Sequence, residues 1–187
     1  GIIYNTKMVK EKVDSWSILM IDNPRDAMGV ALMYLGYSIN TTDRGELQKA
    51  YDLLRAQKPI LQAYVMDQIF DKLEVGEAAM GVYYAGDFLS MKENNPDLAF
   101  VIPKEGANLF VDAMCVPKGS KNKTEGEAWI NFMCSYEASL ANLEYIWYGS
   151  PNTKAMNDFL AELDTEDAAV LNPSKEALAQ GEMFLNL

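Results

Sequence analysis

Short apolar runs alternate with capped helical segments over the first hundred residues, and this alternation constrains the fold more than any other feature of the chain. Apolar runs predict strands at residues 1–4, 18–21, 60–65, 78–84 and 98–102. Between them, apolar residues recur at helical spacing, and Asn23-Pro24 and the Asp43–Glu46 capping box mark two helix starts. Helices of about 10 to 15 residues between strands are typical of βαβ units. The pattern therefore predicts an α/β sheet rather than a helical bundle or an all-β barrel.

One carboxylate interrupts an apolar run in the second half of the chain. The apolar residues of 111–116 surround Asp112 and predict a buried strand. A carboxylate inside such a strand needs a cationic partner or donated hydrogen bonds. Asp112 therefore either pairs locally at a strand edge or receives a cationic ligand, with Phe110 two residues away as an aromatic wall.

Polar and aromatic residues also gather at two predicted strand-to-helix turns. Asn23 and Asp26 follow the strand that ends at Ile21, whereas Tyr84 ends the strand at 78–84 and Asp87 comes shortly after it. In open α/β sheets, ligands bind outside the carboxyl ends of strands, so we expect both turns to lie at a binding site. The alternative is that Asn23 and Asp26 serve only the helix cap and the helix dipole.

Composition excludes several kinds of chemistry. The chain has no histidine, which removes His-dependent catalytic triads and His-ligated zinc. Cys115 and Cys134 are too far apart for a C-x-x-C pair, so we expect two buried thiols and neither a metal ion nor a disulfide framework. The net charge of −11 argues against nucleic acid and anionic membranes as partners, tolerates a cationic ligand, and equally serves solubility.

The ends of the chain are unusual for a whole protein. Neither a run of about 18 apolar residues nor a signal segment is present in these residues. The chain opens with the strand-like GIIYN and ends in the apolar MFLNL. We therefore expect a piece of a longer protein that binds its ligand weakly by itself. The exposed Met114–Val116 strand or the MFLNL tail could pair with another copy, so a dimer of the truncated chain is possible.

A series of short motifs resembles one family of proteins. In order, they are GIIYN, DSW, IDNPRDA, LGYSIN, GVYYAGD, PKEG, KNKTEGEAWINFM and YGSPN. Their order and spacing are similar, over nearly the whole chain, to the later part of the bacterial spermidine/putrescine-binding components of ABC importers. The resemblance implies an α/β fold of the type II periplasmic-binding kind, mostly the second lobe with part of the first. Residues 1–111 would form the second lobe, 112–151 a crossover segment returning into the first lobe, and 152–187 a helical return to the second.

The resemblance also implies a ligand site in a cleft between the lobes. In this family, carboxylates hold the ammonium groups of the ligand and aromatic rings line its methylene chain. The residues at matching positions are Asn23, Asp26, Tyr84, Phe110, Asp112 and Tyr148. Tyr84 and Phe110 stand where Trp is common, Asn23 replaces an acidic residue, and Phe184 stands where Gln is common. One carboxylate fewer should favour a smaller or less charged ligand.

The function expected from this resemblance is binding, without enzymatic activity, metal ion or cofactor. The chain would belong to the extracytoplasmic component of an ABC importer that binds putrescine or spermidine and delivers it to a membrane permease. Its location would be periplasmic, or the cell surface through a lipid anchor in a Gram-positive bacterium. The alternatives are a binding protein for another small solute, such as an amino acid derivative or a metal complex, and the ligand-sensing domain of a LysR-type regulator. The regulator would require an upstream helix-turn-helix, which these residues do not contain.

Overall fold

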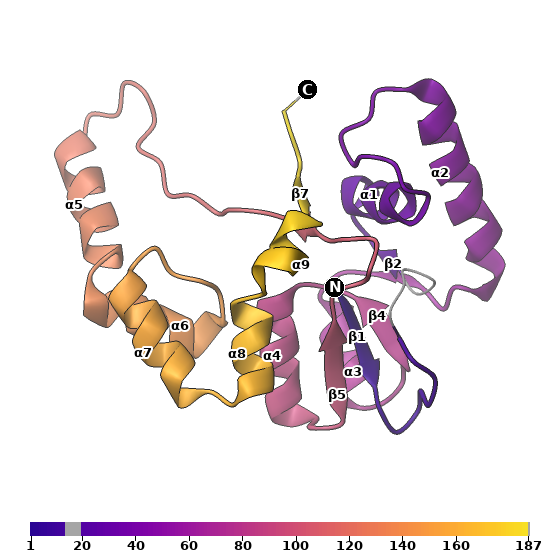
Figure 1. Cartoon of the computed structure of the whole chain (residues 1–187). Helices are drawn as coiled ribbons and strands as arrows, with labels where there is room; N and C mark the ends of the chain where they lie inside the picture. Colours follow the sequence, from indigo (N-terminus) through magenta and orange to yellow (C-terminus); the bar gives the residue numbers. More distant parts are fainter. Residues whose placement is uncertain (14–19, 187) are drawn as a thin grey trace. The chain divides into compact units, whose positions relative to one another are not determined.

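The computed structural model describes residues 1–13 and 20–186, and the chain forms two compact units (Figure 1). Unit 1 comprises Gly1–Phe110 together with Ser174–Leu187, and unit 2 comprises Val111–Pro173. The DSW motif and the first two residues of the strand predicted at 18–21 lie outside the described residues. The chain thus leaves unit 1 once, builds unit 2, and returns.

A three-stranded antiparallel sheet forms the centre of unit 1 (Figure 1). β1 (Ile2–Asn5) lies between β4 (Met80–Val82) and β5 (Leu98–Val101). Ile2 and Ile3 are both fully buried, so both faces of β1 are covered, as its unbroken apolar sequence predicts. α3 (Gln68–Glu74) contacts β4, and α4 (Ala85–Asn94) packs on β5.

Two helices with predicted caps connect a parallel strand pair in unit 1. β2 (Met20–Ile21) pairs with β3 (Tyr64–Val65) through α1 (Pro24–Tyr34) and α2 (Arg44–Gln57). This is the βαβ connection that the alternation of strands and helices predicts. The caps are as expected, because Asn23 and Asp43 each accept hydrogen bonds from backbone N–H groups in the first turn of their helix. Gly36, with φ of +76°, lies just beyond the end of α1.

The C-terminal segment of the described chain also belongs to unit 1. It contains α9 (Lys175–Ala179) and β7 (Glu182–Met183), and β7 pairs in parallel with β6 (Asn108–Leu109). The approach is close at Gly181, where an added Cβ would lie 2.6 Å from Cγ of Leu109. The β6–β7 pair therefore fixes Asn108 and the residues after Met183 in the same small region.

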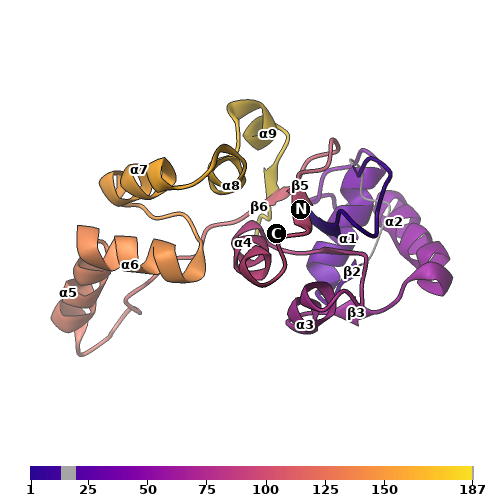
Figure 2. The same ribbon diagram turned by 90° about the horizontal axis from the view of Figure 1, so that it is seen from below.

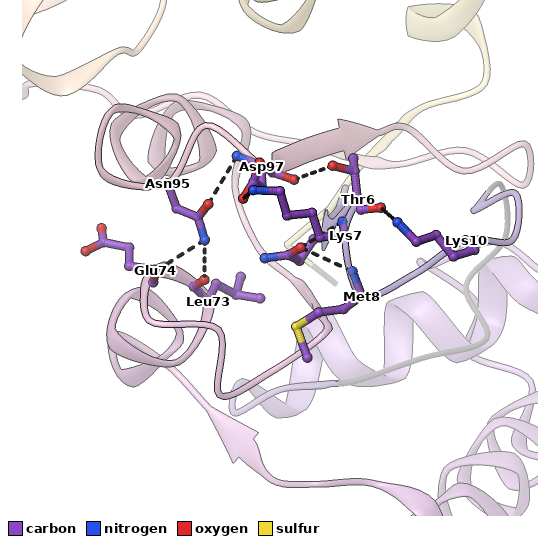
Figure 3. Close-up of polar contacts among 9 residues, drawn as sticks. Thr6, Lys7, Met8, Lys10, Leu73, Glu74, Asn95 and Asp97 are labelled. Atoms are coloured by element: carbon purple, nitrogen blue, oxygen red, sulfur yellow. Dashed lines mark hydrogen bonds and ion pairs between the residues drawn. The ribbon is translucent and has the colours of Figure 1, made fainter.

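Polar contacts join the end of β1 to the turns around α3 and α4 (Figure 3). The side-chain amide of Asn95 donates to the carbonyls of Leu73 and Glu74, at 3.1 and 3.2 Å. The hydroxyl of Thr6 donates to the carbonyl of Asp97 at 2.9 Å. These bonds link side chains to backbone carbonyls at the end of α3 and in the turn before β5.

Unit 2 is helical in its described residues. Its helices are α5 (Lys123–Met133), α6 (Tyr136–Ile146), α7 (Thr153–Glu162) and α8 (Thr165–Leu171). α6 and α7 pack side by side (Figure 2) around Leu143, Ala155 and Phe159, which are almost fully buried. Trp147, in the left-handed conformation, ends α6. None of the described helices in either unit has the length and apolar character needed to cross a membrane.

Two expectations differ from the structure. The buried strand predicted around Asp112 is wrong: residues 111–115 are exposed and extended, and no described strand pairs with them. An apolar run becomes a buried strand only where a neighbour supplies hydrogen bonds and cover, and this run lies where the chain passes from unit 1 to unit 2. Cys115 and Cys134 are exposed rather than buried.

Unit 1 ends at Phe110 and unit 2 runs from Val111 to Pro173. The assignment of these units to the two lobes of a larger protein stays a prediction.

Candidate functional site

A cavity of about 50 Å³ lies in unit 1 beside the first turn of α1. Its walls come from β2, α1, β4 and β6, from the residues that follow β4, and from the segment after β7. Asp26, Tyr84 and Asn108 contribute polar groups, whereas most of the other lining residues are apolar, such as Ile21 and Phe184. A carboxylate in a largely apolar hollow suits a ligand with a cationic end and an apolar stem.

Asp26 is the only carboxylate that lines this cavity among the described residues. Its Oδ1 accepts a hydrogen bond from Nδ2 of Asn108 at 3.1 Å, and its Oδ2 lies 3.5 Å from the hydroxyl of Tyr84, at the limit of a hydrogen bond. Burial raises the pKa of Asp26, and the bonds from Asn108 and Tyr84 and the charge of Arg25 oppose that increase. One oxygen is held firmly, and the other keeps capacity for a further donor.

Aromatic rings form a continuous wall next to this carboxylate. The ring of Tyr84 lies 5.0 Å from that of Tyr83 and 5.3 Å from that of Phe110, measured between centroids. The hydroxyl of Tyr83 donates to Oδ1 of Asp67 at 3.0 Å, and burial raises the pKa of Tyr83, so it remains a neutral phenol. Rings at these separations present faces and edges on which a cation or a methylene chain can rest.

Asn23 fills the structural role that was its alternative interpretation. Its Oδ1 accepts from the backbone N–H groups of Arg25 and Asp26, at 3.1 and 3.5 Å, and so caps α1. The cap fixes the first turn of α1, and this turn holds Asp26. Asn23 is absent from the cavity lining, and its contact with a ligand stays a prediction.

Phe184 and Arg25 hold the segment after β7 against α1. The guanidinium of Arg25 lies 4.4 Å from the ring centroid of Phe184 and donates to the carbonyl of Leu185. Phe184 also lies over Gly29, where an added Cβ would be 3.1 Å from the ring. The residue at the position where the family commonly has Gln thus closes one side of the cavity with an apolar ring.

The remaining two expected site residues belong to unit 2. Asp112 is exposed in the extended segment after Phe110, and Tyr148 is half-buried in the turn after α6. Unit 1 therefore brings together three of the six expected residues, Asp26, Tyr84 and Phe110, with Asn23 as their support. The participation of Asp112 and Tyr148 in the same site stays a prediction.

Asn108 lines the cavity and was not expected from the sequence. A signal was available, because Asn108 lies two residues before Phe110. Alternate residues of an extended chain point to the same side, so Asn108 shares the side of Phe110. Among the described residues, no group of three Cys, Asp or Glu side chains could hold a metal ion.

Comparison with known proteins gives a consistent set of similarities. The family described as bacterial extracellular solute-binding protein matches residues 2–170. A spermidine/putrescine-binding periplasmic protein of Salmonella typhimurium is 29% identical over 182 residues, which are 94% of this chain and 52% of that protein. The putrescine/cadaverine-binding protein of Pseudomonas aeruginosa is 29% identical over 185 residues, covering 96% of this chain and 51% of that protein.

Solved structures show the same similarity. A spermidine/putrescine ABC transporter substrate-binding protein of Streptococcus pneumoniae is 33% identical, with a TM-score of 0.84, over 100% of this chain and 60% of that one. A putative spermidine/putrescine ABC transporter protein from Listeria monocytogenes is 37% identical, with a TM-score of 0.87, over 100% of this chain and 61% of that one. These similarities confirm the expected α/β fold class. The chain spans about half the length of the curated relatives it matches.

Proposed function

Because this chain belongs to the family of bacterial extracellular solute-binding proteins, we propose that it binds a polyamine through the carboxylate and rings of unit 1. The family role is to bind a solute rather than to transform it, and no covalent chemistry is needed. We further propose that the chain acts outside the cytoplasm, in the periplasm or at the cell surface, as part of the binding component of an ABC importer. Its protein partner would then be the membrane permease of that importer.

The observation that carries this proposal is the surroundings of Asp26. A half-buried carboxylate with one oxygen held by Asn108 lies beside the ring of Tyr84 and opens on a cavity. A hydrogen bond between charged groups contributes about 1.5 to 3 kcal/mol, and a cation over an aromatic face contributes about 0.5 to 2 kcal/mol. The ammonium end of an aliphatic amine can make both contacts, with the carboxylate of Asp26 and with the ring of Tyr84. The methylene groups of the amine can then pack on the neighbouring rings.

The names of the relatives support a polyamine as the ligand. The Salmonella protein is named for binding spermidine and putrescine, and the Pseudomonas protein for binding putrescine and cadaverine. These ligands are linear amines with an ammonium group at each end. A second anionic receptor is required for the second ammonium, and Asp112 is the residue that we propose for it. We propose Tyr148 as a further aromatic contact.

A smaller diamine is the favoured ligand within this class. Asn23 stands where the family commonly has an acidic residue, and it is occupied in capping α1. The site therefore has one negative charge fewer than a family member with an acidic residue at this position. We propose putrescine ahead of spermidine for this reason. The expectation of a dimer finds no support in the relatives and stays a prediction.

The proposal is tested by titrating the ¹⁵N-labelled chain with putrescine, spermidine and 1,4-butanediol, while amide shifts are followed by NMR. This method measures affinities as weak as millimolar. Saturable shifts with the two amines, centred on the amides of Asp26, Tyr84 and Asn108, are the expected result. Butanediol has the same carbon chain without charge and should give no saturable shift. Equal responses to putrescine and butanediol, or no saturable response to any amine, would overturn the proposal.

A variant connects the binding to the named carboxylate. Asp26→Asn keeps the shape of the side chain and removes its charge, so putrescine affinity should fall by roughly tenfold to a hundredfold. Asp52→Asn, on the exposed side of α2, is the matched control and should leave the affinity unchanged. If Asp52→Asn weakens binding as much as Asp26→Asn, the attraction is a general effect of the negative charge of the chain.

A further inference from the structure

Asn108 has one amide atom in use and one buried without a partner. Its Nδ2 donates to Oδ1 of Asp26 at 3.1 Å. Its Oδ1 is buried and has no hydrogen-bond partner. Exchanging the two amide atoms would place a carbonyl oxygen against a carboxylate oxygen, which is repulsive, so the contact with Asp26 determines the orientation. The chain therefore holds an acceptor out of water beside the carboxylate of the cavity.

An acceptor in this position is unfavourable until a donor reaches it. Asn108 lines the cavity together with Asp26 and Tyr84, so a group bound in the cavity can supply that donor. The donor must also suit the neighbouring carboxylate, which favours a cation. A primary ammonium group meets both conditions, because it carries a positive charge and three N–H bonds.

We propose that Asn108 is a further ligand-binding residue, whose Oδ1 accepts a hydrogen bond from the same primary ammonium group that binds Asp26. This inference rests on the proposed function and specifies the chemical class of the ligand's end. Oδ2 of Asp26 takes one N–H, Oδ1 of Asn108 takes a second, and the ring of Tyr84 lies next to the carboxylate. The cavity of about 50 Å³ has room for a few water-sized groups, that is, an ammonium group with its first methylene groups.

The predicted specificity is for N–H donors and not simply for positive charge. A quaternary ammonium group carries the same charge as a primary one but has no N–H bond. It would leave Oδ1 of Asn108 unpaired, and its methyl groups would occupy more of the cavity. A buried acceptor that loses its only donor penalises the wrong ligand more strongly than a small difference in apolar contact does.

Asn108 also acts as a positioning residue for Asp26. Its Nδ2 bond lowers the pKa of Asp26 against the effect of burial and so favours the ionised form that binds a cation. The other groups that bear on Asp26 are the hydroxyl of Tyr84 and the guanidinium of Arg25, which also favour its ionised form.

The test compares Asn108→Leu with the unaltered chain, using NMR titration with two probes. The first probe is putrescine, and the second is fully N-methylated putrescine, whose two quaternary groups keep both charges and have no N–H. We expect the unaltered chain to prefer putrescine by about tenfold or more, and Asn108→Leu to lose most of this preference through weaker putrescine binding. The affinity for the methylated probe should change little.

The pH dependence of putrescine affinity provides the second readout. Without the Nδ2 bond, the pKa of Asp26 rises, so the loss of affinity on acidification should begin at a higher pH in Asn108→Leu than in the unaltered chain. If the role of Asn108 were purely structural, Asn108→Leu would weaken the binding of both probes equally. It would not shift the pH at which half of the putrescine affinity is lost, which is the midpoint of the pH dependence. Asn142→Leu is the matched control, since Asn142 is half-buried and donates to the carbonyl of Ala138 on α6.

The possible outcomes separate the two proposals. If the unaltered chain binds putrescine and Asn108→Leu keeps both the preference and the midpoint, the inference about Asn108 fails and the proposed function stands. If the unaltered chain binds neither probe, both fail. Should Asn108→Leu not fold, judged from its NMR spectrum, Asn108→Ser replaces it, because a shorter side chain cannot reach Asp26 and creates no steric conflict. An equal loss of preference in Asn142→Leu would also overturn the inference.

Discussion

Asp26 combines two opposing requirements in one side chain. Folding partly buries its carboxylate, which is unfavourable for the ionised form, whereas a cationic ligand requires that form. Asn108 and Tyr84 offset part of the cost by hydrogen bonding. A residue held in this way is expected to reduce the stability of the chain without ligand and to increase its affinity for the ligand.

The first prediction concerns the stability of the ligand-free chain. The folded-state pKa of Asp26 is raised, so its contribution to stability is fully present below the unfolded-state pKa and is lost as the pH rises through the folded-state pKa. Asp26→Asn should therefore be more stable than the unaltered chain near pH 7. The difference should shrink as the pH falls below about 4.

Urea unfolding of the two chains at several pH values measures this difference. Asp112→Asn is the matched control, because Asp112 is exposed and its charge is already in water. Its free energy of unfolding should equal that of the unaltered chain at each pH. A lower stability of Asp26→Asn near pH 7 would mean that the carboxylate stabilises the fold and that the conflict described above does not exist.

The second prediction concerns the aromatic wall. Phe110 is 45% exposed and contacts Tyr84 edge-on, so a larger ring can be placed there without disturbing a packed core. Phe110→Trp should strengthen putrescine binding severalfold, because the indole face attracts cations better and covers more of the methylene chain. Phe110→Leu, similar in apolar character but without a ring face, should weaken it. NMR titration of both variants checks this, and unchanged affinity in both would remove Phe110 from the site.

The sequence predicts local features of the site better than distant ones. The caps at Asn23 and Asp43 are correct because a cap is made within two or three residues. The sequence did not indicate Asn108, and it indicated Phe184 only through the family resemblance. Both residues reach the cavity through the pairing of β6 with β7, which lie more than seventy residues apart in the sequence. The residues around Asp112 were wrongly predicted as buried, since apolar character alone does not identify a covering partner.

At the scale of elements, β7 and the residues after it complete the cavity. Asn40 holds this segment with a pair of bonds: its Nδ2 donates to the carbonyl of Met183, and its Oδ1 accepts from the N–H of Leu185, both at 2.8 Å. Ser38 adds a bond to the carboxylate of Glu182 at 2.6 Å. The loop after α1 thus binds the backbone of β7 and of the residues after it, through one donated and one accepted hydrogen bond of the Asn40 amide.

The third prediction follows from this contact. Asn40→Ala removes both bonds, so the chain should lose about 1 to 2 kcal/mol of stability. Hydrogen exchange at the Leu185 amide should become much faster, because its acceptor is lost. Asn23→Ala should cost a similar amount, about 1 kcal/mol, through the cap of α1, while the Leu185 amide keeps its partner. Exchange at Leu185 that is equally fast in both variants would show that the segment responds to global stability and not to Asn40.

The fold class was accessible from the sequence at this scale, whereas the arrangement of strands was not. Capped helices between apolar runs predicted the βαβ connection of β2 and β3, which the structure contains. The antiparallel position of β1 between β4 and β5 could not be predicted, because pairing partners are chosen by contacts far apart in the sequence. The segment at 58–60 forms a 3₁₀ turn at the start of the run predicted as a strand, with Pro59 in its first turn.

At the scale of the whole molecule, the relevant feature is the carboxylate of Asp112 in unit 2. The fourth prediction is that Asp112→Asn weakens the affinity for putrescine while leaving the affinity for butylamine unchanged. Butylamine has one ammonium group, which Asp26 satisfies, whereas putrescine has a second that requires another carboxylate. A hydrogen bond to a charged group is worth about 1.5 to 3 kcal/mol, so the loss for putrescine should be roughly tenfold or more.

NMR titration of the unaltered chain and Asp112→Asn with both amines measures this effect. Asp164→Asn, also in unit 2, is a control for the loss of one negative charge from that unit. Asp164→Asn should change the affinities for putrescine and butylamine only slightly, and by the same factor. If Asp112→Asn binds putrescine as tightly as the unaltered chain does, Asp112 does not take part in the site and the ligand is held by unit 1 alone.

The pairing of β6 with β7 has a consequence for the order of events on the ribosome. Asn108 emerges long before Glu182, and the whole of unit 2 is synthesised between them. Until β7 emerges, the nascent chain holds a carboxylate at Asp26 with neither the ring of Phe184 nor the backbone of Leu185 beside it. The helices of unit 2 can form from local contacts during this interval. The cavity is therefore completed only after β7 has been synthesised, whereas the other residues that line it all precede unit 2 along the chain.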